Sequence, residues 1–208
     1  LDILFEDEEI AIINKSAGLV VHPGTGISTG TLVNGLVDHF NSLSDLNGQI
    51  RPGIVHRLDA NTSGIMVIAK TNMAHANLAN QFLNRRVKKK YTALTWGLWT
   101  ENSGEIDQPI ARKKKDPTSY IVSEDGKSSI TRYKVEKKFR HLSKVSFYPK
   151  TGRTHQIRVH AAHMGHAVAG DERYGNQEFN SIMKSKGLRR LFLHALSISF
   201  VWPQTEAE

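Results

Sequence analysis

The sequence predicts an α+β fold in which a mixed, largely antiparallel central sheet carries flanking helices and loops. Several short segments alternate apolar and polar residues as strands do, and others place apolar residues at helical spacing. The two kinds of segment follow one another without the regular strand–helix–strand rhythm of a parallel sheet. No internal repeat and no long linker divides the 208 residues. We therefore expect one domain spanning residues 1–208.

The first elements are a hairpin, a short strand, a helix and a buried strand. Residues 3–14 alternate around an acidic segment, which predicts two hairpin strands, and residues 18–22 predict a short strand. Residues 32–40 carry apolar positions at helical spacing, and Thr31 before them is a suitable N-cap. A continuous apolar run over residues 65–70 predicts a buried strand.

Strands dominate the rest of the chain. Apolar residues at helical spacing predict a helix over residues 72–84, and a stretch rich in Thr, Trp and Tyr predicts a strand over residues 91–98. Further strands are expected over residues 129–139 and 144–148, and a last one over residues 191–202. Together with the first half, these strands supply the predicted antiparallel sheet.

Residues 155–164 predict a helix with recognisable end signals. Ile157, Ala161 and Met164 form one apolar stripe. Thr154 is the expected cap and Gly165 the expected stop. The basic run at residues 112–115 is instead expected in a loop, because prolines stand on both sides of it.

Composition excludes several classes of protein. Hydrophobic residues make up 39% of the chain, as in ordinary globular domains, and there is no cysteine. Without cysteine there can be no disulfide scaffold, thiolate zinc site, iron–sulfur cluster or cysteine nucleophile. No apolar stretch approaches the roughly 20 residues of a membrane-spanning helix, and no leader pattern opens the chain. We expect a cytoplasmic protein with no membrane partner.

The net charge favours a polyanionic partner. Lysine and arginine number 28 against 20 aspartate and glutamate residues, which gives a formal charge of +8. A charge of this size also simply keeps many proteins soluble. Composition alone therefore favours nucleic acid only modestly.

A first polar cluster lies before the strand at residues 65–70. It consists of His56-Arg57-Leu58-Asp59 followed by Thr62-Ser63-Gly64. A carboxylate set among a cation and two hydroxyls is oriented and kept charged, so Asp59 is a candidate nucleophile or base. The alternative is an Asx turn, in which Asp59 or Asn61 bonds only the backbone of its own loop.

A second polar cluster surrounds the predicted helix at residues 155–164. Arg158 lies beside its apolar stripe and needs an anionic partner, for which Asp59 is one candidate. The helix N-terminus, backed by Arg153, is also suited to a phosphate group. The alternative is an amphipathic helix with a solvated basic face.

Metal binding is not expected from the histidines of this second cluster. His155, His160, His163 and His166 are close in sequence, but no glutamate completes a metalloprotease pattern. Zinc sites also usually show a cleaner ligand set.

Several ordered motifs resemble the pseudouridine synthases of types A, C and D that modify large-subunit ribosomal RNA. They are His56-Arg57-Leu58-Asp59 with Thr62-Ser63-Gly64, the segment from Thr151 to His160, Lys90-Tyr91 in place of a Lys-x-Tyr motif, Gly170-Asp171-x-x-Tyr174-Gly175, and Leu193-His194-Ala195. The resemblance implies the catalytic fold of that family, one catalytic domain over residues 1–208, and no cofactor or metal. Relatives often carry a small RNA-binding domain upstream, which we expect to lie outside this chain.

The resemblance also implies roles for individual residues. Asp59 corresponds to the catalytic aspartate, Arg158 to its ion-pair partner, and Tyr91 to the ring that stacks on the target base. Arg57 corresponds to the residue that helps to fill the space of a flipped nucleotide. The set expected to bind RNA is His56, Arg57, Thr62, Lys88, Lys89, Lys90, Arg153, His155 and Gln156.

The predicted activity is isomerisation of specific uridines in RNA, with large-subunit ribosomal RNA favoured as the substrate. Two alternatives stay open. One is a pseudouridine synthase that acts on transfer RNA. The other is a catalytically silent RNA-binding or ribosome-assembly factor with the same fold.

Overall fold

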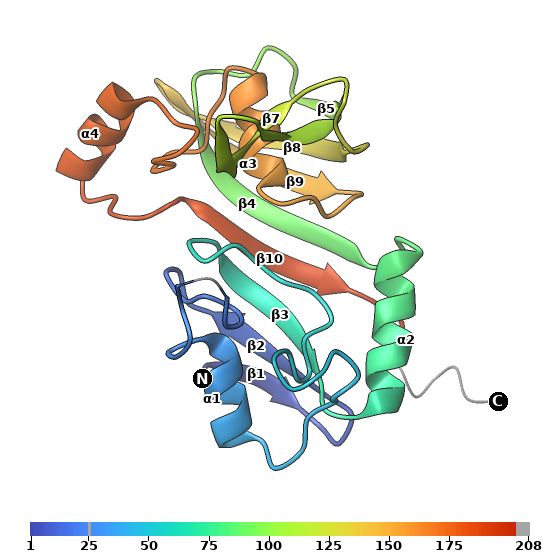
Figure 1. The fold of residues 1–208 in the computed structure, drawn as a ribbon. Helices are drawn as coiled ribbons and strands as arrows, with labels where there is room; N and C mark the ends of the chain where they lie inside the picture. The colour runs from blue at the N-terminus through green and yellow to red at the C-terminus, as the bar shows by residue number, and fades with distance from the viewer. Residues whose placement is uncertain (25, 203–208) are drawn as a thin grey trace. The chain divides into compact units, whose positions relative to one another are not determined.

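The computed structural model describes residues 1–24 and 26–202, which form two compact units (Figure 1). Unit 1 contains Leu1–Lys88 and the segment that begins at Ala195, and unit 2 contains Lys89–His194. The predicted α+β class is confirmed, since helices are combined with sheets whose printed strand pairs are all antiparallel. That residues 1–208 act as one catalytic domain stays a prediction.

Unit 1 contains an antiparallel sheet and two helices. Its elements are β1 (Ile3–Glu6), β2 (Ile10–Lys15), α1 (Leu32–His39), β3 (Ser63–Ala69), α2 (Asn72–Leu83) and the part of β10 (Leu193–Ser199) from Ala195 onward. β1 pairs with β2 as the predicted hairpin, and β2 pairs with β3. β10 follows β3 in the sheet, and a Cβ atom on Gly64 would collide with the backbone of Ala195. That position therefore needs glycine.

The two helices of unit 1 begin as their sequences predict. The Thr31 side chain accepts a hydrogen bond from the Asn34 amide, and the Asn34 side chain accepts one from the Thr31 amide, which forms a capping box. Thr71 caps α2 through the Ala74 amide. Leu78 of α2 packs in one apolar cluster with buried residues of β2 and β3.

The short strand predicted at residues 18–22 is wrong. The carbonyl groups of Val20 and Val21 accept hydrogen bonds from the amides of Leu32 and Val33. The first amides of a helix have no partner within the helix, so these carbonyls complete the start of α1. The segment is used as a helix partner rather than as a sheet strand.

Unit 2 contains an antiparallel sheet with the strand order β4-β9-β8-β5. The strands are β4 (Lys88–Trp96), β5 (Ser103–Asp107), β8 (Ile130–Lys138) and β9 (Leu142–Pro149), with Lys88 itself assigned to unit 1. Its core contains the fully buried Trp99, whose ring lies 4.3 Å from that of Tyr133 and 6.1 Å from that of Phe147. Ile157 and Ala161 of the predicted apolar stripe belong to the same core.

The loop predicted around residues 112–115 is wrong, because those residues belong to a hairpin. β6 (Ile110–Lys113) pairs with β7 (Asp116–Val122) as a separate two-stranded sheet. Pro117 lies at the start of β7, where a strand tolerates a residue that lacks an amide hydrogen. The basic run therefore occupies the tip of a β-ribbon.

Unit 2 also contains α3 (Gln156–His163) and α4 (Gln177–Ser185). The helix predicted over residues 155–164 is confirmed as α3, but the Thr154 cap is wrong. His155 is the N-cap, in a left-handed conformation and without a capping side-chain bond. Sequence reasoning missed α4, whose start was marked by a capping residue, Asn176. Within residues 1–24 and 26–202, no helix has the length and apolar character needed to cross a membrane.

Candidate active site

Asp59 lies in unit 1 on the loop that leads into β3. Its side chain is half-buried, between the buried Leu58 and the half-buried Ala60. The Asp59 carbonyl accepts a hydrogen bond from the Thr62 amide at 3.1 Å, which closes a turn. Thr62 itself is buried and directly precedes β3. The carboxylate is thus carried on a compact turn at the end of a rigid element, where functional residues often lie.

Lys15 is hydrogen-bonded to the backbone of this loop. It was not identified as a site residue from the sequence. Its side chain is 1% exposed, and its Nζ atom donates to the carbonyls of Ser16, Leu19 and Ala60 at 2.8–2.9 Å. Burial lowers the pKa of Lys15 to about 8, and the nearby negative charge of Asp59 opposes part of that decrease. The sequence does mark it, because Lys15 is a single lysine at the end of the otherwise mostly apolar strand β2.

His56 and Arg57 have different surroundings on the same loop. The Nε2 atom of His56 accepts a hydrogen bond from the Val67 amide at 3.1 Å, and its ring stacks on Phe82 with centroids 4.7 Å apart. Arg57 is exposed, and its Nη1 atom lies 3.4 Å from Nε2 of His22. His56 therefore anchors the loop to β3, while the Arg57 side chain is accessible to a ligand.

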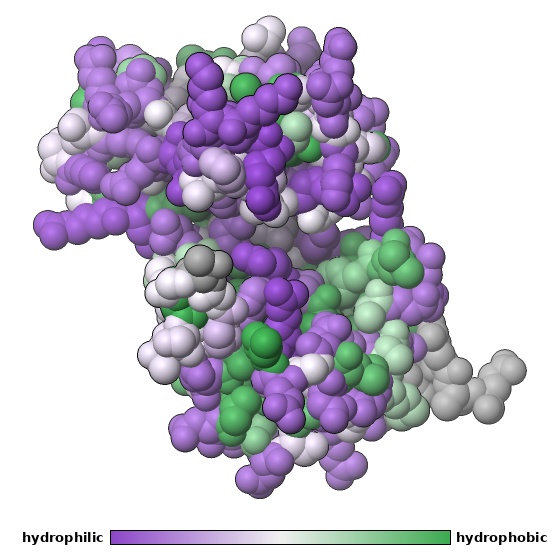
Figure 2. Space-filling model, viewed as in Figure 1, coloured by the Kyte–Doolittle hydropathy of each residue, from purple (hydrophilic) through white to green (hydrophobic). Residues whose placement is uncertain are grey.

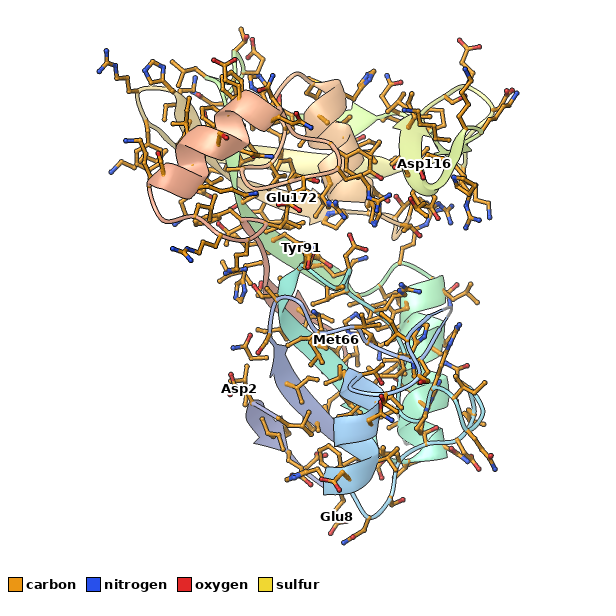
Figure 3. All side chains as sticks on the ribbon, turned by 60° about the vertical axis from the view of Figure 1, so that its left-hand side comes forward. Asp2, Glu8, Met66, Tyr91, Asp116 and Glu172 are labelled. Atoms are coloured by element: carbon orange, nitrogen blue, oxygen red, sulfur yellow. The ribbon has the colours of Figure 1, made fainter. Side chains whose placement is uncertain are left out.

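The predicted RNA-binding segment on β4 combines a tyrosine with three lysines. Tyr91 is half-buried opposite Phe147 and packs against the core of unit 2 (Figure 3). Lys88 is exposed, and Lys90 lies 4.0 Å from the carboxylate of Glu136. Burial lowers the pKa of Lys89. The Tyr91 ring is thereby attached to a packed element, and cations precede it directly.

Arg158 and Asp171 form a buried ion pair in unit 2. Arg158 Nε lies 2.8 Å from Asp171 Oδ2, and Arg158 Nη2 lies 2.9 Å from Asp171 Oδ1. The same carboxylate accepts hydrogen bonds from the amides of Arg173 and Tyr174. Sequence reasoning expected an anion near Arg158 but missed Asp171, which was marked by the Gly170-Asp171 motif. The pairing of Arg158 with Asp59 stays a prediction.

Gln156 has a structural role at the start of α3, and the RNA contact expected for it stays a prediction. Its amide oxygen accepts from Thr151 Oγ1 and the Arg153 amide, and its Nε2 donates to the Ile130 carbonyl and to Thr131 Oγ1, all within 3.0 Å. The side chain is buried, and its four hydrogen-bonding positions are used within the protein. Gln156 therefore fixes the loop that carries Arg153.

Arg153 and His155 flank Gln156 and are both half-buried. Arg153 Nε donates to the Ser128 carbonyl at 3.2 Å, and Nδ1 of His155 lies 2.6 Å from the Tyr174 hydroxyl. Arg153 and His155 precede α3 directly, and Arg158 lies in its first turn. Their contacts with RNA stay predictions.

Two of the histidines weighed as metal ligands, His160 and His166, have separate partners. His160 is fully buried between Thr131 Oγ1 and the Gln108 carbonyl, each at 2.9 Å. His166 bonds the Trp96 carbonyl at 2.8 Å and stacks on Trp99. These imidazoles therefore serve packing and hydrogen bonding in unit 2.

The chain is similar to known RNA-modifying proteins over nearly all of its length. The family described as RNA pseudouridylate synthase matches residues 9–163. A protein of Bacillus subtilis (strain 168) named "Uncharacterized RNA pseudouridine synthase YlyB" is 46% identical, covering 99% of this chain and 66% of that protein. "Ribosomal large subunit pseudouridine synthase D" of Zymomonas mobilis is 39% identical, covering 98% of this chain and 65% of that protein.

A solved structure has a similar fold. "Human RNA Pseudouridylate Synthase Domain Containing 1" matches with a TM-score of 0.77 at 28% identity, and the match covers 95% of this chain and 77% of that one. The present chain spans about two thirds of the length of the two curated bacterial relatives.

Proposed function

Because this chain belongs to the RNA pseudouridylate synthase family, we propose that it isomerises uridine to pseudouridine in large-subunit ribosomal RNA. The choice of RNA is supported by relatives named ribosomal large subunit pseudouridine synthases C and D. The formal charge of +8 suits a polyanionic substrate of this kind.

Asp59 is the catalytic carboxylate in this proposal, acting as a nucleophile or base toward the flipped nucleoside. The observation that carries the proposal is its half-buried position on a turn pinned by the buried ammonium group of Lys15. The positive charge of Lys15 lies close enough to attract the Asp59 carboxylate. Because the turn is held at the Ala60 carbonyl, the carboxylate is oriented before the substrate arrives.

The reaction exchanges one glycosidic bond for another. The bond from C1′ to N1 of uracil breaks, the base turns, and a bond forms between C1′ and C5. C5 then loses a proton and N1 gains one, so the atoms balance and no oxidant, reductant or group donor is needed. This chemistry needs a carboxylate that acts as a nucleophile or base, and a base that takes the C5 proton.

The uridine must leave its stack before Asp59 can reach it, at a cost of a few kcal/mol. Arg57 offers an exposed guanidinium group and Tyr91 an aromatic ring, and both can stack on bases. Arg158 is proposed as the ion-pair partner of Asp59, and its contribution is a set of guanidinium hydrogen-bond donors that Asp171 holds in position. The further residues proposed to contact the RNA around the target are His56, Thr62, Lys88, Lys89, Lys90, Arg153, His155 and Gln156.

The test is the substitution Asp59→Asn, with Asp38→Asn as a matched control on the exposed face of α1. Asp59→Asn removes a charge but little contact area. It should abolish pseudouridine formation while RNA affinity changes by less than about tenfold. The control should keep full activity. Pseudouridine that persists in the Asp59→Asn variant would contradict the proposed role.

The substrate itself can be identified in cells. Pseudouridine is mapped in total RNA from a strain that lacks the gene and from the same strain expressing either wild-type protein or Asp59→Asn. Sites that return only with the wild-type protein, and that lie in large-subunit ribosomal RNA, would support the proposal. If the restored sites lie only in transfer RNA, then transfer RNA and not ribosomal RNA is the substrate. If no sites return, the protein is better explained as a catalytically silent RNA-binding factor.

A further inference from the structure

Three contacts meet at Tyr174 in unit 2. Its hydroxyl oxygen accepts a hydrogen bond from the Tyr120 amide of β7 at 3.0 Å and lies 2.6 Å from Nδ1 of His155. Its ring lies beneath the guanidinium group of Arg158, with 5.0 Å between the guanidinium carbon and the ring centroid. The Tyr174 hydroxyl group therefore contacts both the β6–β7 hairpin and His155 at the start of α3, while the ring contacts Arg158.

The His155 backbone needs such support. Its φ angle of 57° lies in the left-handed region, which a non-glycine residue occupies only at an energetic cost. Tyr174 bonds the His155 ring, and the rings of Tyr120 and Tyr174 both approach it edge-on with centroids 5.5 Å away. Contacts with the hairpin and with Tyr174 thus help to hold the turn from which α3 and Arg158 begin.

Arg173 makes a second connection to the same hairpin. Its Nη1 atom donates to Ser119 Oγ at 3.0 Å, bonds Thr118 Oγ1, and lies 3.8 Å from the Asp116 carboxylate. Hydrogen bonds from Ser119 and Thr118 lower the pKa of Asp116 to about 2, so the carboxylate stays charged. The backbone amides of Arg173 and Tyr174 bond Asp171, the partner of Arg158. The turn at residues 171–174 therefore joins β7 to the Arg158 ion pair.

The free end of the hairpin is strongly basic. Arg112, Lys113, Lys114 and Lys115 are consecutive and exposed, and hydrophilic side chains cover most of the face of unit 2 seen in Figure 2. A two-stranded ribbon is marginally stable by itself, so its position depends on what holds it. Its base is fixed where Ile110 bridges Lys127, and its β7 strand is fixed by Tyr174 and Arg173.

We infer that Tyr174 is a positioning residue that docks the basic β6–β7 hairpin as an RNA-binding arm, in a fixed position relative to Arg158. Four cations on a held ribbon bind phosphates with less loss of conformational freedom than the same cations on a free one. This inference rests on the proposed RNA substrate. Beyond that function, the inference assigns a role to the hydrogen bond from the Tyr120 amide to the Tyr174 hydroxyl group. This bond links the hairpin that binds RNA to the beginning of α3.

The experiment combines Tyr174→Phe with a tip variant in which Lys113, Lys114 and Lys115 are all replaced by alanine. Tyr174→Phe deletes the hydroxyl group but keeps the ring beneath Arg158. With a large-subunit ribosomal RNA transcript, we expect KM to rise about five- to tenfold while kcat stays within about twofold. The tip variant should also raise KM and should make KM less dependent on salt concentration.

The double variant separates docking from a merely local role. If the hydroxyl acts through the hairpin, Tyr174→Phe should add less than about twofold to KM in the tip variant, because the two changes affect one interaction. Equal increases in KM in both backgrounds would overturn the inference. Tyr148→Phe is the matched control, since its ring is retained and its hydroxyl has no hydrogen bond among those described.

Hydrogen exchange tests the docking without RNA. Amides of residues 118–122 should exchange faster in Tyr174→Phe than in the wild-type protein and in Tyr148→Phe. Unchanged protection of these amides would also overturn the inference. If the wild-type protein neither binds the transcript nor forms pseudouridine, the proposed function fails. If it does both but the KM effects are additive, only the role of Tyr174 fails.

Discussion

The two units each bury a cation close to a predicted catalytic segment, but they surround it differently. In unit 1, Lys15 is enclosed by three neutral carbonyl groups, and no carboxylate bonds its ammonium group in the described part of the chain. In unit 2, Arg158 is held by both oxygens of the Asp171 carboxylate. Lys15 is thus stabilised by the dipoles of carbonyl groups, whereas the charge of Arg158 is neutralised by a carboxylate.

This difference assigns distinct electrostatic roles to the two cations. The charge of Lys15 is not cancelled by an adjacent anion, so its field extends to the carboxylate of Asp59. The charge of Arg158 is largely compensated by Asp171, so that pair contributes geometry and hydrogen-bond donors more than net charge. We therefore expect Lys15 to set the charge around Asp59, and Asp171 to set the position of Arg158.

The largest effect is expected from breaking the ion pair of unit 2. Asp171→Ala leaves the buried Arg158 without its bonded counter-charge, which should lower the free energy of unfolding by about 3–5 kcal/mol. Urea denaturation of the wild-type and variant proteins measures the change. The neighbouring Glu172→Ala is the control, because its salt bridge with Lys184 is exposed and should contribute no more than about 1 kcal/mol. A similar loss in both variants would show that Asp171 does not stabilise Arg158.

The effect of Lys15, the buried cation of unit 1, should instead be seen in the pH dependence of the free energy of unfolding. Lys15 has a pKa of about 8 in the folded protein against 10.5 as its ordinary value, so its charged form costs stability below pH 8. Between pH 8 and pH 10.5 the folded state releases a proton that the unfolded state keeps, and stability should rise with pH. The difference between 10.5 and about 8 corresponds to about 3 kcal/mol.

The measurement compares the wild-type protein with Lys15→Met by urea denaturation from pH 7 to pH 10.5. The wild-type protein should gain stability relative to the variant across this range, while the exposed Lys114→Met should change in parallel with the wild type. Arg158 should give no such effect, because arginine stays protonated throughout. Parallel curves for the wild type and Lys15→Met would mean that Lys15 is not a buried, uncompensated cation.

The same contrast explains how much of the fold could be predicted from the sequence. The hairpin of β1 and β2, helix α1 with its Thr31 cap, and helix α2 follow from local periodicity and end signals. The β6–β7 hairpin does not, because its prolines suggested a loop and its position depends on contacts with Tyr174 and Arg173, more than 50 residues away. Local sequence therefore determines which segments become helices and strands, whereas contacts between residues distant in sequence determine the position of the β6–β7 hairpin.

The candidate site divides in the same way. The loop position of Asp59, and the helix that carries Arg158, were predicted from the sequence. The buried contacts of Lys15 with Ala60, 45 residues away, were not, since they depend on how β2 packs beneath the loop. Asp171 was visible in a motif, but its role appears only when the turn folds back onto α3.

The smallest expected effect compares how α1 and α3 begin. Thr31→Ala removes a capping side chain and should cost about 1 kcal/mol of unfolding free energy. Thr154→Ala should change it by less than about 0.5 kcal/mol, because Thr154 is exposed and the N-cap of α3 is His155. Urea denaturation of the two variants measures both values. Equal losses would mean that Thr154 caps α3 after all. Unequal ones would show that α1 begins with a local side chain and α3 with the tertiary contacts of His155.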